Sequence, residues 1–318
     1  MSDCGQIVLS TVFLNWNRSD LLQQAVESYI RTVTVKHEVV IIDNASTDGS
    51  QEIIAALCQG RPNFRSLFLP ANEGGMALNR VTQSLRGQYF HFSENDLEYL
   101  PGWDKKVVAK FEAFPKLGQL SLFSPFRQPG EVWSGDFPAR QMTQGNQMIY
   151  LAEANVGSSS VIRRGVWEKG VRWTNIESGR FKFPNDARYS DEVKQTGYDV
   201  AWSDEYLVIN WGHNIEDIAR RLPYYVESYQ AKGWGNLDVF RRRLEQRGYT
   251  LIKGKGSYQI TKLSELGAGW RWFSWSLSWS LYRPRYKISR PFYKLKRSVK
   301  KRLPRLIQMV RPRVDPQS

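Results

Sequence analysis

The sequence predicts an α/β fold built on a mostly parallel, doubly wound sheet. Short apolar runs, typical of strands buried on both faces, alternate four times with amphipathic helical segments before residue 99. This alternation indicates right-handed crossovers between parallel strands. A length of 318 residues allows a large domain of this class, and a hydrophobic content of 41% excludes a disordered chain.

The first half supplies the regular part of the predicted sheet. Its strands are expected at 7–14, 38–42, 64–69 and 89–92. Each intervening helix carries apolar residues on one face, and Ser19 or Asp20 is expected to cap the first helix. The three predicted helices include residues 21–29, 53–57 and 77–85, respectively.

The second half is less regular and predicts a mixed arrangement packed on the same sheet. Helices are expected near 103–113, 186–196 and 237–247, and strands near 118–122, 147–151, 159–163, 198–202 and 206–211. The resulting organisation is a first half at 1–98, a second half of the same domain at 99–235, an extension at 236–266 and a tail at 267–318.

Three polar clusters follow predicted strands, at the edge where an open parallel sheet binds its ligands. They are Asn15 with Asn17, Asp43 with Asn44, and Glu94-Asn95-Asp96. Any one cluster is explained as a turn, but three at one edge favour a site. The chain has neither G-x-G-x-x-G after its first strand nor G-x-x-x-x-G-K-[ST], so a bound diphosphate needs another partner. Two acids spaced as in Glu94-Asn95-Asp96 can hold Mg²⁺ or Mn²⁺.

Four sequence blocks together resemble glycosyltransferase family 2, whose members have the GT-A fold. The blocks are VLSTVFLNWNRSDLL, EVVIIDNASTDGS, NEGGMALNR and FHFSENDLEYLPGW, and they span residues 7–103 in the order that the family shows. The resemblance implies an inverting, metal-assisted transfer of a sugar from a nucleoside diphosphate. It also implies a GT-A-like sheet with a mixed half that binds the acceptor.

The resemblance assigns roles to residues at the strand ends. Asp43 would bind the base or ribose of the donor, Glu94 would lie near the ribose, and Asp96 would bind the metal. Glu94 departs from the Asp that usually begins the family's D-x-D motif. The remaining donor-binding candidates are asparagines: Asn15, Asn17, Asn44, Asn79 and Asn95.

The resemblance implies two further functional positions. His213, shortly after the last core strand, would contact the metal or diphosphate, or else cap a strand end. The catalytic base would be Asp186 at the start of a helix, a position that is also typical of an N-cap. Asp191 and Glu192 on the same helix are the alternatives.

Aromatic side chains follow His213 and occur within the second half. Tyr224, Tyr225 and Tyr229 could form a lid or an acceptor wall, or simply pack against the body of the protein. We also expect Trp173 and the serines of 157–160 to contact the acceptor.

The positive charge of the chain lies almost entirely in its tail. The net charge is +14, and 267–318 contributes +13 of it, with fourteen Lys or Arg and one acid. A nearly neutral body argues against a nucleic-acid partner. An apolar helical stripe over 287–310, with aromatic residues before it, favours contact of 270–310 with an anionic membrane. A dimerisation helix or a basic disordered arm is the alternative.

These observations predict a glycosyltransferase that adds one sugar to a glycan or lipid-linked acceptor. The donor would be a UDP-, GDP- or dTDP-sugar, with Mn²⁺ or Mg²⁺ as cofactor. Because we find no spanning segment or leader, we expect a cytoplasmic protein held peripherally at the inner face of the membrane. The alternatives are a sugar-nucleotide pyrophosphorylase and a non-catalytic module that binds anionic lipid.

Overall fold

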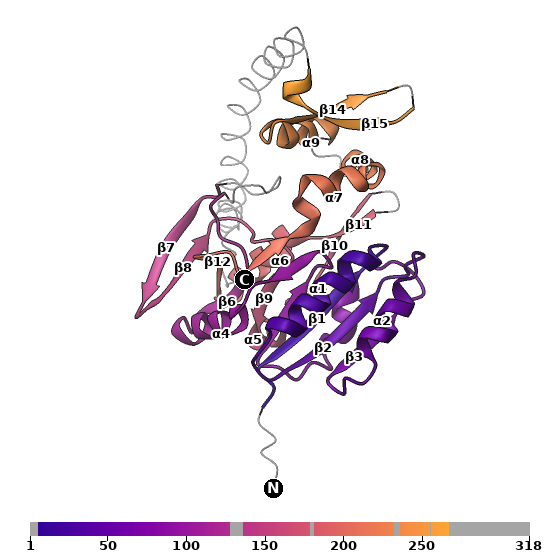
Figure 1. Ribbon diagram of the computed structural model, residues 1–318. Coiled ribbons are helices and arrows are strands. Elements are labelled where there is room, and N and C mark those ends of the chain that lie inside the picture. The colour runs from indigo at the N-terminus through magenta and orange to yellow at the C-terminus, as the bar shows by residue number, and fades with distance from the viewer. Residues whose placement is uncertain (1–5, 128–135, 179–180, 232–235, 255, 267–318) are drawn as a thin grey trace, which may run out of the picture. The chain divides into compact units, whose positions relative to one another are not determined.

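The structure is a computed structural model that describes residues 6–127, 136–178, 181–231, 236–254 and 256–266 (Figure 1). The chain divides into two compact units. The first comprises Met1–Arg247 and Leu251–Ile260, and it contains both of the predicted halves, 1–98 and 99–235. The second comprises Gly248–Thr250 and Thr261–Ser318.

Nine strands form one sheet in the first unit, in the order β3-β2-β1-β4-β9-β6-β12-β8-β7. They are β1 (Leu9–Asn15), β2 (His37–Asp43), β3 (Phe64–Phe68), β4 (Tyr89–Ser93), β6 (Leu117–Ser121), β7 (Ala139–Gln144), β8 (Gln147–Ala152), β9 (Ser160–Arg163) and β12 (Asp199–Ser203). β1 is parallel to β2 and β4, and β2 to β3. β9 runs antiparallel to β4 and β6, which begins the mixed half. The predicted fold class is confirmed.

Three pairs of short strands lie outside the large sheet. β5 (Leu97–Tyr99) pairs antiparallel with β13 (Val208–Asn210), and β10 (Asn175–Ser178) pairs antiparallel with β11 (Phe181–Pro184). β14 (Tyr249–Lys253) and β15 (Tyr258–Lys262) form the third pair. The strand predicted near 206–211 is therefore β13. The sequence analysis missed β7, β5, β10 and β11, and the last three have only three or four residues, too few to show a clear period.

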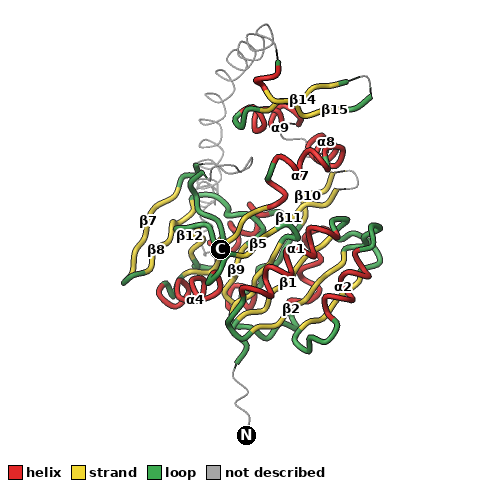
Figure 2. The backbone as a smooth tube through the Cα atoms, in the orientation of Figure 1, coloured by secondary structure: helices red, strands yellow, loops and turns green. Residues whose placement is uncertain are grey.

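The α-helices that the structure describes belong to the first unit and are red in Figure 2. They are α1 (Ser19–Thr32), α2 (Ser50–Cys58), α3 (Asn79–Thr82), α4 (Trp103–Ala113), α5 (Arg164–Glu168), α6 (Asp186–Gln195), α7 (Ile215–Arg220), α8 (Leu222–Ala231) and α9 (Asn236–Glu245). Single 3₁₀ turns are η1 (Gly74–Leu78), η2 (Trp211–His213) and η3 (Leu263–Glu265).

Alternate residues of the central strands bury their side chains on opposite faces of the sheet. Phe13 and Ile41 belong to one apolar cluster, which α1, α2 and α4 complete. Their neighbours Val12 and Val40 belong to the other cluster, which η1, α3, α5 and α6 complete. This period of two, with helices on both faces, gives the three layers of a doubly wound fold.

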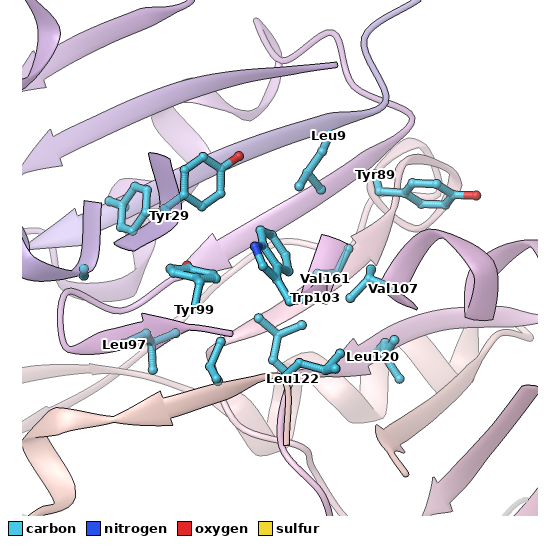
Figure 3. Close-up of a cluster of buried hydrophobic side chains, with 14 of the residues drawn as sticks. Leu9, Tyr29, Tyr89, Leu97, Tyr99, Trp103, Val107, Leu120, Leu122 and Val161 are labelled. Carbon is cyan, nitrogen blue, oxygen red and sulfur yellow. The ribbon is translucent and has the colours of Figure 1, made fainter. Parts of the chain in front are cut away.

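An aromatic group occupies the centre of the first cluster (Figure 3). The ring centroids of Tyr29 and Tyr99 are 5.2 Å apart, and those of Tyr99 and Trp103 are 4.8 Å apart. All three side chains are buried. Because Tyr99 belongs to β5, this packing fixes the strand that directly follows Asp96.

The expected cap of the first helix is wrong. Ser19 and Asp20 lie within α1, and the N-cap is Arg18, whose side chain makes no capping hydrogen bond. The Ser19 amide instead donates to Asp48 Oδ2 at 3.0 Å, so the loop after β2 satisfies this helix end. Arg18 is thereby left with its side chain available for another contact.

The predicted membrane contact at 270–310 lies outside the described residues. Within the part of the chain that the structure describes, no helix combines the length and the apolar character needed to cross a bilayer.

Asp104 of α4 joins that helix to the loop between α1 and β2. Its Oδ2 accepts hydrogen bonds from the Thr34 and Val35 amides, at 2.5 and 2.8 Å. Burial alone raises the pKa of the Asp104 carboxyl, but these hydrogen bonds outweigh burial and the pKa lies below its ordinary value. A carboxylate of this kind stabilises the fold above its unfolded pKa of about 3.9, and this contribution is lost as the pH falls through the folded value.

We predict that Asp104→Asn lowers the free energy of unfolding by about 1–3 kcal/mol at pH 7, because the loop amides lose a charged acceptor. Urea denaturation of variant and wild type should show a smaller difference at pH 3. Glu112→Gln, at an exposed position of α4, is the control and should change stability by less than about 0.5 kcal/mol. An equal loss from Asp104→Asn at both pH values would contradict the prediction.

Candidate functional site

A pocket of about 380 Å³ opens at the carboxyl ends of β1, β2 and β4. The register pairs Asn15 with Asp43 and Phe13 with Ser93, so these strands end side by side. The pocket is lined by Leu14, Trp16, Arg18, Asn44, Asn72, Gly74, Glu94, Asn95, Asp96, Phe181, Lys182, Phe183, Pro184, Gly212, Tyr224, Tyr225, Ser228, Tyr229 and Arg243.

Asn15 connects the three strand ends behind the pocket wall. Its side-chain amide donates to Asp43 Oδ1 at 3.4 Å and to Ser50 Oγ at 2.8 Å. Its Oδ1 accepts from the Asn95 side-chain amide at 2.7 Å. Asn15 and Asp43 are fully buried and do not line the pocket, whereas Asn95 does. The structure therefore brings the predicted clusters together and places Asp43 in the supporting network.

The other predicted asparagines hold the loops around the pocket. Asn17, with a positive φ of 52°, accepts from the Thr47 amide at 2.7 Å. Asn44 lines the pocket and donates to the Gly74 carbonyl at 3.2 Å. Asn79 donates to the Trp173 carbonyl at 2.8 Å. Asn17 and Asn79 do not line the pocket, and their hydrogen bonds join loops next to it.

Glu94 faces the pocket, and two serines fix its carboxyl group. Ser158 donates to Oε1 at 2.7 Å and Ser159 donates to Oε2 at 3.1 Å. Burial, together with the charge of nearby Asp96, raises the pKa of Glu94. Ser158 and Ser159, which we expected to contact the acceptor, hydrogen-bond to Glu94 in the structure. Trp173, also expected to reach the acceptor, is 2% exposed and stacks on Tyr189 instead.

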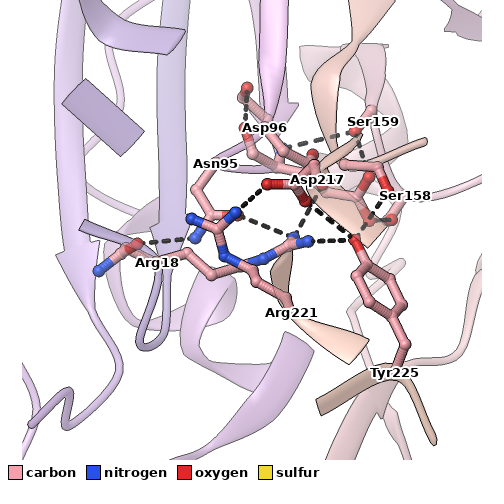
Figure 4. Close-up of polar contacts among 12 residues, drawn as sticks. Arg18, Asn95, Asp96, Ser158, Ser159, Asp217, Arg221 and Tyr225 are labelled. Carbon is pink, nitrogen blue, oxygen red and sulfur yellow. Dashed lines mark hydrogen bonds and ion pairs between the residues drawn. The ribbon is translucent and has the colours of Figure 1, made fainter. Parts of the chain in front are cut away.

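Asp96 forms a buried ion pair with Arg18 (Figure 4). Arg18 Nη1 lies 2.8 Å from Asp96 Oδ2, and the two side chains are 13% and 7% exposed. Burial alone lowers the pKa of the Arg18 guanidinium, but Asp96 and the neighbouring tyrosines outweigh it, so this pKa is raised. The sequence analysis did not assign a role to Arg18, since one arginine in a polar turn carries no periodic or motif signal by itself.

Tyr225 of α8 holds the other end of the guanidinium. Its hydroxyl accepts from Arg18 Nη2 at 2.8 Å and donates to the Gly212 carbonyl at 2.7 Å. Ion pairs of α7 and of the following Arg221 support this position: Arg220 lies 3.3 Å from Asp20, and Arg221 pairs with both Asp20 and Asp217 (Figure 4). The segment containing α7 and α8 is therefore attached to the start of α1.

Aromatic rings form another part of the pocket lining. Trp16 lies 5.9 Å from Phe181 and 6.5 Å from Tyr224, measured between ring centroids. Phe181 comes from β11, which the sequence analysis missed, although Phe181 and Phe183 alternate with Lys182 as in a strand. Tyr224, Tyr225 and Tyr229 also line the pocket, as their interpretation as a wall requires.

The three predicted catalytic acids lie on α6, and none of them lines the pocket. Asp186 is the first residue of the helix, two residues after the pocket-lining Pro184. The N-cap is Asn185, whose side chain accepts from the Arg188 amide, so Asp186 is not the cap. Asp191 is exposed, and Glu192 accepts from Arg188 Nε at 2.7 Å.

One pocket atom suits a divalent cation. Asp96 Oδ1 is buried and has no hydrogen-bond partner among the described residues. No group of three His, Cys, Asp or Glu side chains that could hold a metal occurs among the described residues. His213 ends η2, and its side chain is outside the described part of the chain. Mg²⁺ commonly binds through one or two carboxylates together with substrate phosphates and water. Asp96 can supply one such carboxylate.

Comparison with a known structure shows the same architecture. The chain superimposes on the crystal structure of GalNAc-T7 with UDP, GalNAc and Mn²⁺ with a TM-score of 0.52 and 17% identity. The similarity covers 67% of this chain and 44% of that chain. At this identity the comparison supports the fold alone.

Sequence comparison identifies two bacterial relatives. The uncharacterized glycosyltransferase YibD of Escherichia coli (strain K12) is 24% identical over 205 residues, which are 63% of this chain and 56% of YibD. The uncharacterized glycosyltransferase alr2836 of Nostoc sp. (strain PCC 7120) is 27% identical over 113 residues, or 35% of each chain. The matches thus span about half of YibD and a third of alr2836.

The model of one family matches residues 10–170, about half of the chain. The match runs from β1 to the helix that follows β9 and includes the pocket residues of all three strand ends. With the sheet order, the site at the carboxyl edge and these relatives, it shows that the chain belongs to glycosyl transferase family 2.

Proposed function

We propose that the protein transfers a single sugar from a nucleoside-diphosphate donor to an acceptor hydroxyl, with inversion and with the help of Mn²⁺ or Mg²⁺. This proposal rests on Asp96, which lines a pocket at the carboxyl edge of the sheet and whose buried Oδ1 has no hydrogen-bond partner among the described residues. A cation held there would neutralise the charge that develops on the departing diphosphate.

Residues of the chain would bind the cation and the donor and would remove the proton from the acceptor. Asp96 would hold the cation, and Glu94, whose carboxyl group is fixed by two serines, would lie near the ribose. The rings of Trp16, Phe181 and Tyr224 offer apolar faces on which a base or a sugar can stack. An acid of α6 removes the proton from the acceptor hydroxyl as that oxygen attacks the anomeric carbon.

The donor would be a UDP-, GDP- or dTDP-sugar, and the acceptor a glycan or a lipid-linked precursor. GalNAc-T7, a protein of similar fold, has a structure with UDP, GalNAc and Mn²⁺, which is consistent with this class of donor. Direct attack by the acceptor in a single displacement inverts the anomeric centre, so the enzyme requires one base and no covalent nucleophile.

We predict that UDP, GDP or dTDP raises the unfolding temperature in the presence of Mn²⁺ because cation and diphosphate bind together at Asp96. A thermal-shift panel of the three nucleotides, with Mn²⁺ and with a chelator, measures this effect. Release of nucleoside diphosphate from the matching nucleotide sugar should fall at least about a hundredfold in Asp96→Ala. Pyrophosphate-dependent release of a nucleoside triphosphate would instead identify a pyrophosphorylase.

We predict that Asp186→Asn lowers kcat by about 10²–10⁴-fold, because a general base contributes on this scale. Donor binding should stay unchanged, since the base acts on the acceptor. Asp191→Asn and Glu192→Gln on the same helix are matched controls, and steady-state kinetics should show little change in either variant. A larger loss of kcat in Asp191→Asn or Glu192→Gln would assign the base to that residue instead.

We also propose that 270–310 binds an anionic membrane at the inner face, where a lipid-linked acceptor would be found. The support is the net charge of +13 in 267–318 and the apolar stripe within it. The full chain should cosediment with vesicles containing phosphatidylserine and not with neutral vesicles, and binding should weaken as salt rises. Equal binding to both kinds of vesicle would contradict an electrostatic contact.

A further inference from the structure

Two buried polar atoms without partners lie on the two residues of the Asp96–Arg18 ion pair. They are Asp96 Oδ1, which can only accept while ionised, and Arg18 Nε, whose hydrogen can only be donated. Both residues line the pocket, and neither atom has a hydrogen-bond partner within the described residues. Buried polar groups are almost always hydrogen-bonded in native proteins, so this pair indicates a ligand.

Asp96 Oδ1 and Arg18 Nε require ligands of opposite charge. A cation satisfies the carboxylate oxygen, and an anionic oxygen satisfies the guanidinium hydrogen. A metal-bound diphosphate supplies both, since guanidinium groups bind phosphate oxygens strongly and carboxylates bind the metal. The metal would meet a competitor at this carboxylate, because Arg18 Nη1 lies 2.8 Å from Asp96 Oδ2 and already provides a cationic partner.

The guanidinium is held firmly enough to act as that partner. Tyr225 accepts from Nη2 at 2.8 Å, and the rings of Tyr224 and Tyr225 lie 5.6 and 5.9 Å from the guanidinium carbon. Space around the pair is tight, because a Cβ added to Gly212 would meet Asp96 Oδ2 at 2.2 Å and Arg18 Nη2 at 3.0 Å. The chain therefore keeps position 212 small where the ion pair packs.

We propose that Arg18 is a donor-binding residue that serves as the internal counter-ion of Asp96 and competes with the divalent cation for it. Without donor, the pair is neutral and attracts Mn²⁺ weakly. A bound diphosphate offers Arg18 phosphate oxygens as new partners, which frees Asp96 for the cation. Donor and metal then bind cooperatively, and Arg18 sets the strength of their coupling. This inference rests on the proposed function.

The test separates the two ligands and uses binding as its readout, on the full chain. Mn²⁺ alone is titrated by the electron paramagnetic resonance signal of the free ion. UDP, GDP and dTDP are titrated by calorimetry in the presence of a chelator. In Arg18→Gln, affinity for Mn²⁺ alone should rise about tenfold or more, because Asp96 loses its competing cation. Affinity for the nucleotide without metal should fall about tenfold or more, because a charged phosphate contact is lost.

Two further variants make the result specific. Arg243→Gln removes another pocket arginine, which hydrogen-bonds Tyr229 instead of Asp96, and should leave affinity for Mn²⁺ alone unchanged. Arg18→Lys keeps the charge but lacks the planar fork. It should retain the weak Mn²⁺ binding of the wild type and bind nucleotide without metal about threefold or more weakly. If Arg18→Gln does not fold, the affinity of Arg18→Lys for nucleotide without metal decides the test.

Unchanged or lower affinity for Mn²⁺ alone in folded Arg18→Gln would overturn the inference, as would unchanged nucleotide affinity in both Arg18 variants. The proposed function fails differently: the wild type would then bind none of the three nucleotides, with or without Mn²⁺. If the wild type binds nucleotide and the Arg18 variants have unchanged affinities for Mn²⁺ and nucleotide, the role of Arg18 is refuted and the proposed function is not.

Discussion

The parallel register of β1, β2 and β4 is the constraint on which the site depends. It aligns Asn15 with Asp43 and pairs Ser93, the last residue of β4, with Phe13, so that loops far apart in sequence begin at one edge. The buried amide of Asn15 then connects Asp43 to Asn95. Because buried polar groups need partners, this network fixes the turn that carries Glu94 and Asp96.

The second half of the unit completes the site from the other side. The β10–β11 hairpin contributes Phe181, and α8 contributes Tyr225, which holds Arg18 against Asp96. Glu94 is held by serines that precede β9, the strand antiparallel to β4. A site assembled from both halves couples the carboxyl edge of the parallel strands to the mixed half of the fold. It also explains why the pocket has acidic and basic groups in contact.

The ion pair in the pocket lining would give the carboxylate two roles. A buried charge is stable only with a counter-charge, and Arg18 provides one within the chain. The catalytic use of Asp96 would require the same oxygen atoms to serve a metal. Exchange of one counter-ion for another is electrostatically feasible here, because an incoming diphosphate would bring enough negative charge to retain both cations near the pocket.

The sequence by itself determined the local features: the alternation of strands and helices, the burial of 7–14 and 38–42 on both faces, and the polar residues that end each strand. These follow from periodicity and turn chemistry, which act over a few residues. Only the tertiary structure placed Asp43 behind the pocket wall, Arg18 between Asp96 and Tyr225, and Phe181 in the lining. Such contacts join residues as many as 207 positions apart, as for Arg18 and Tyr225, and no local pattern encodes a partner at that distance.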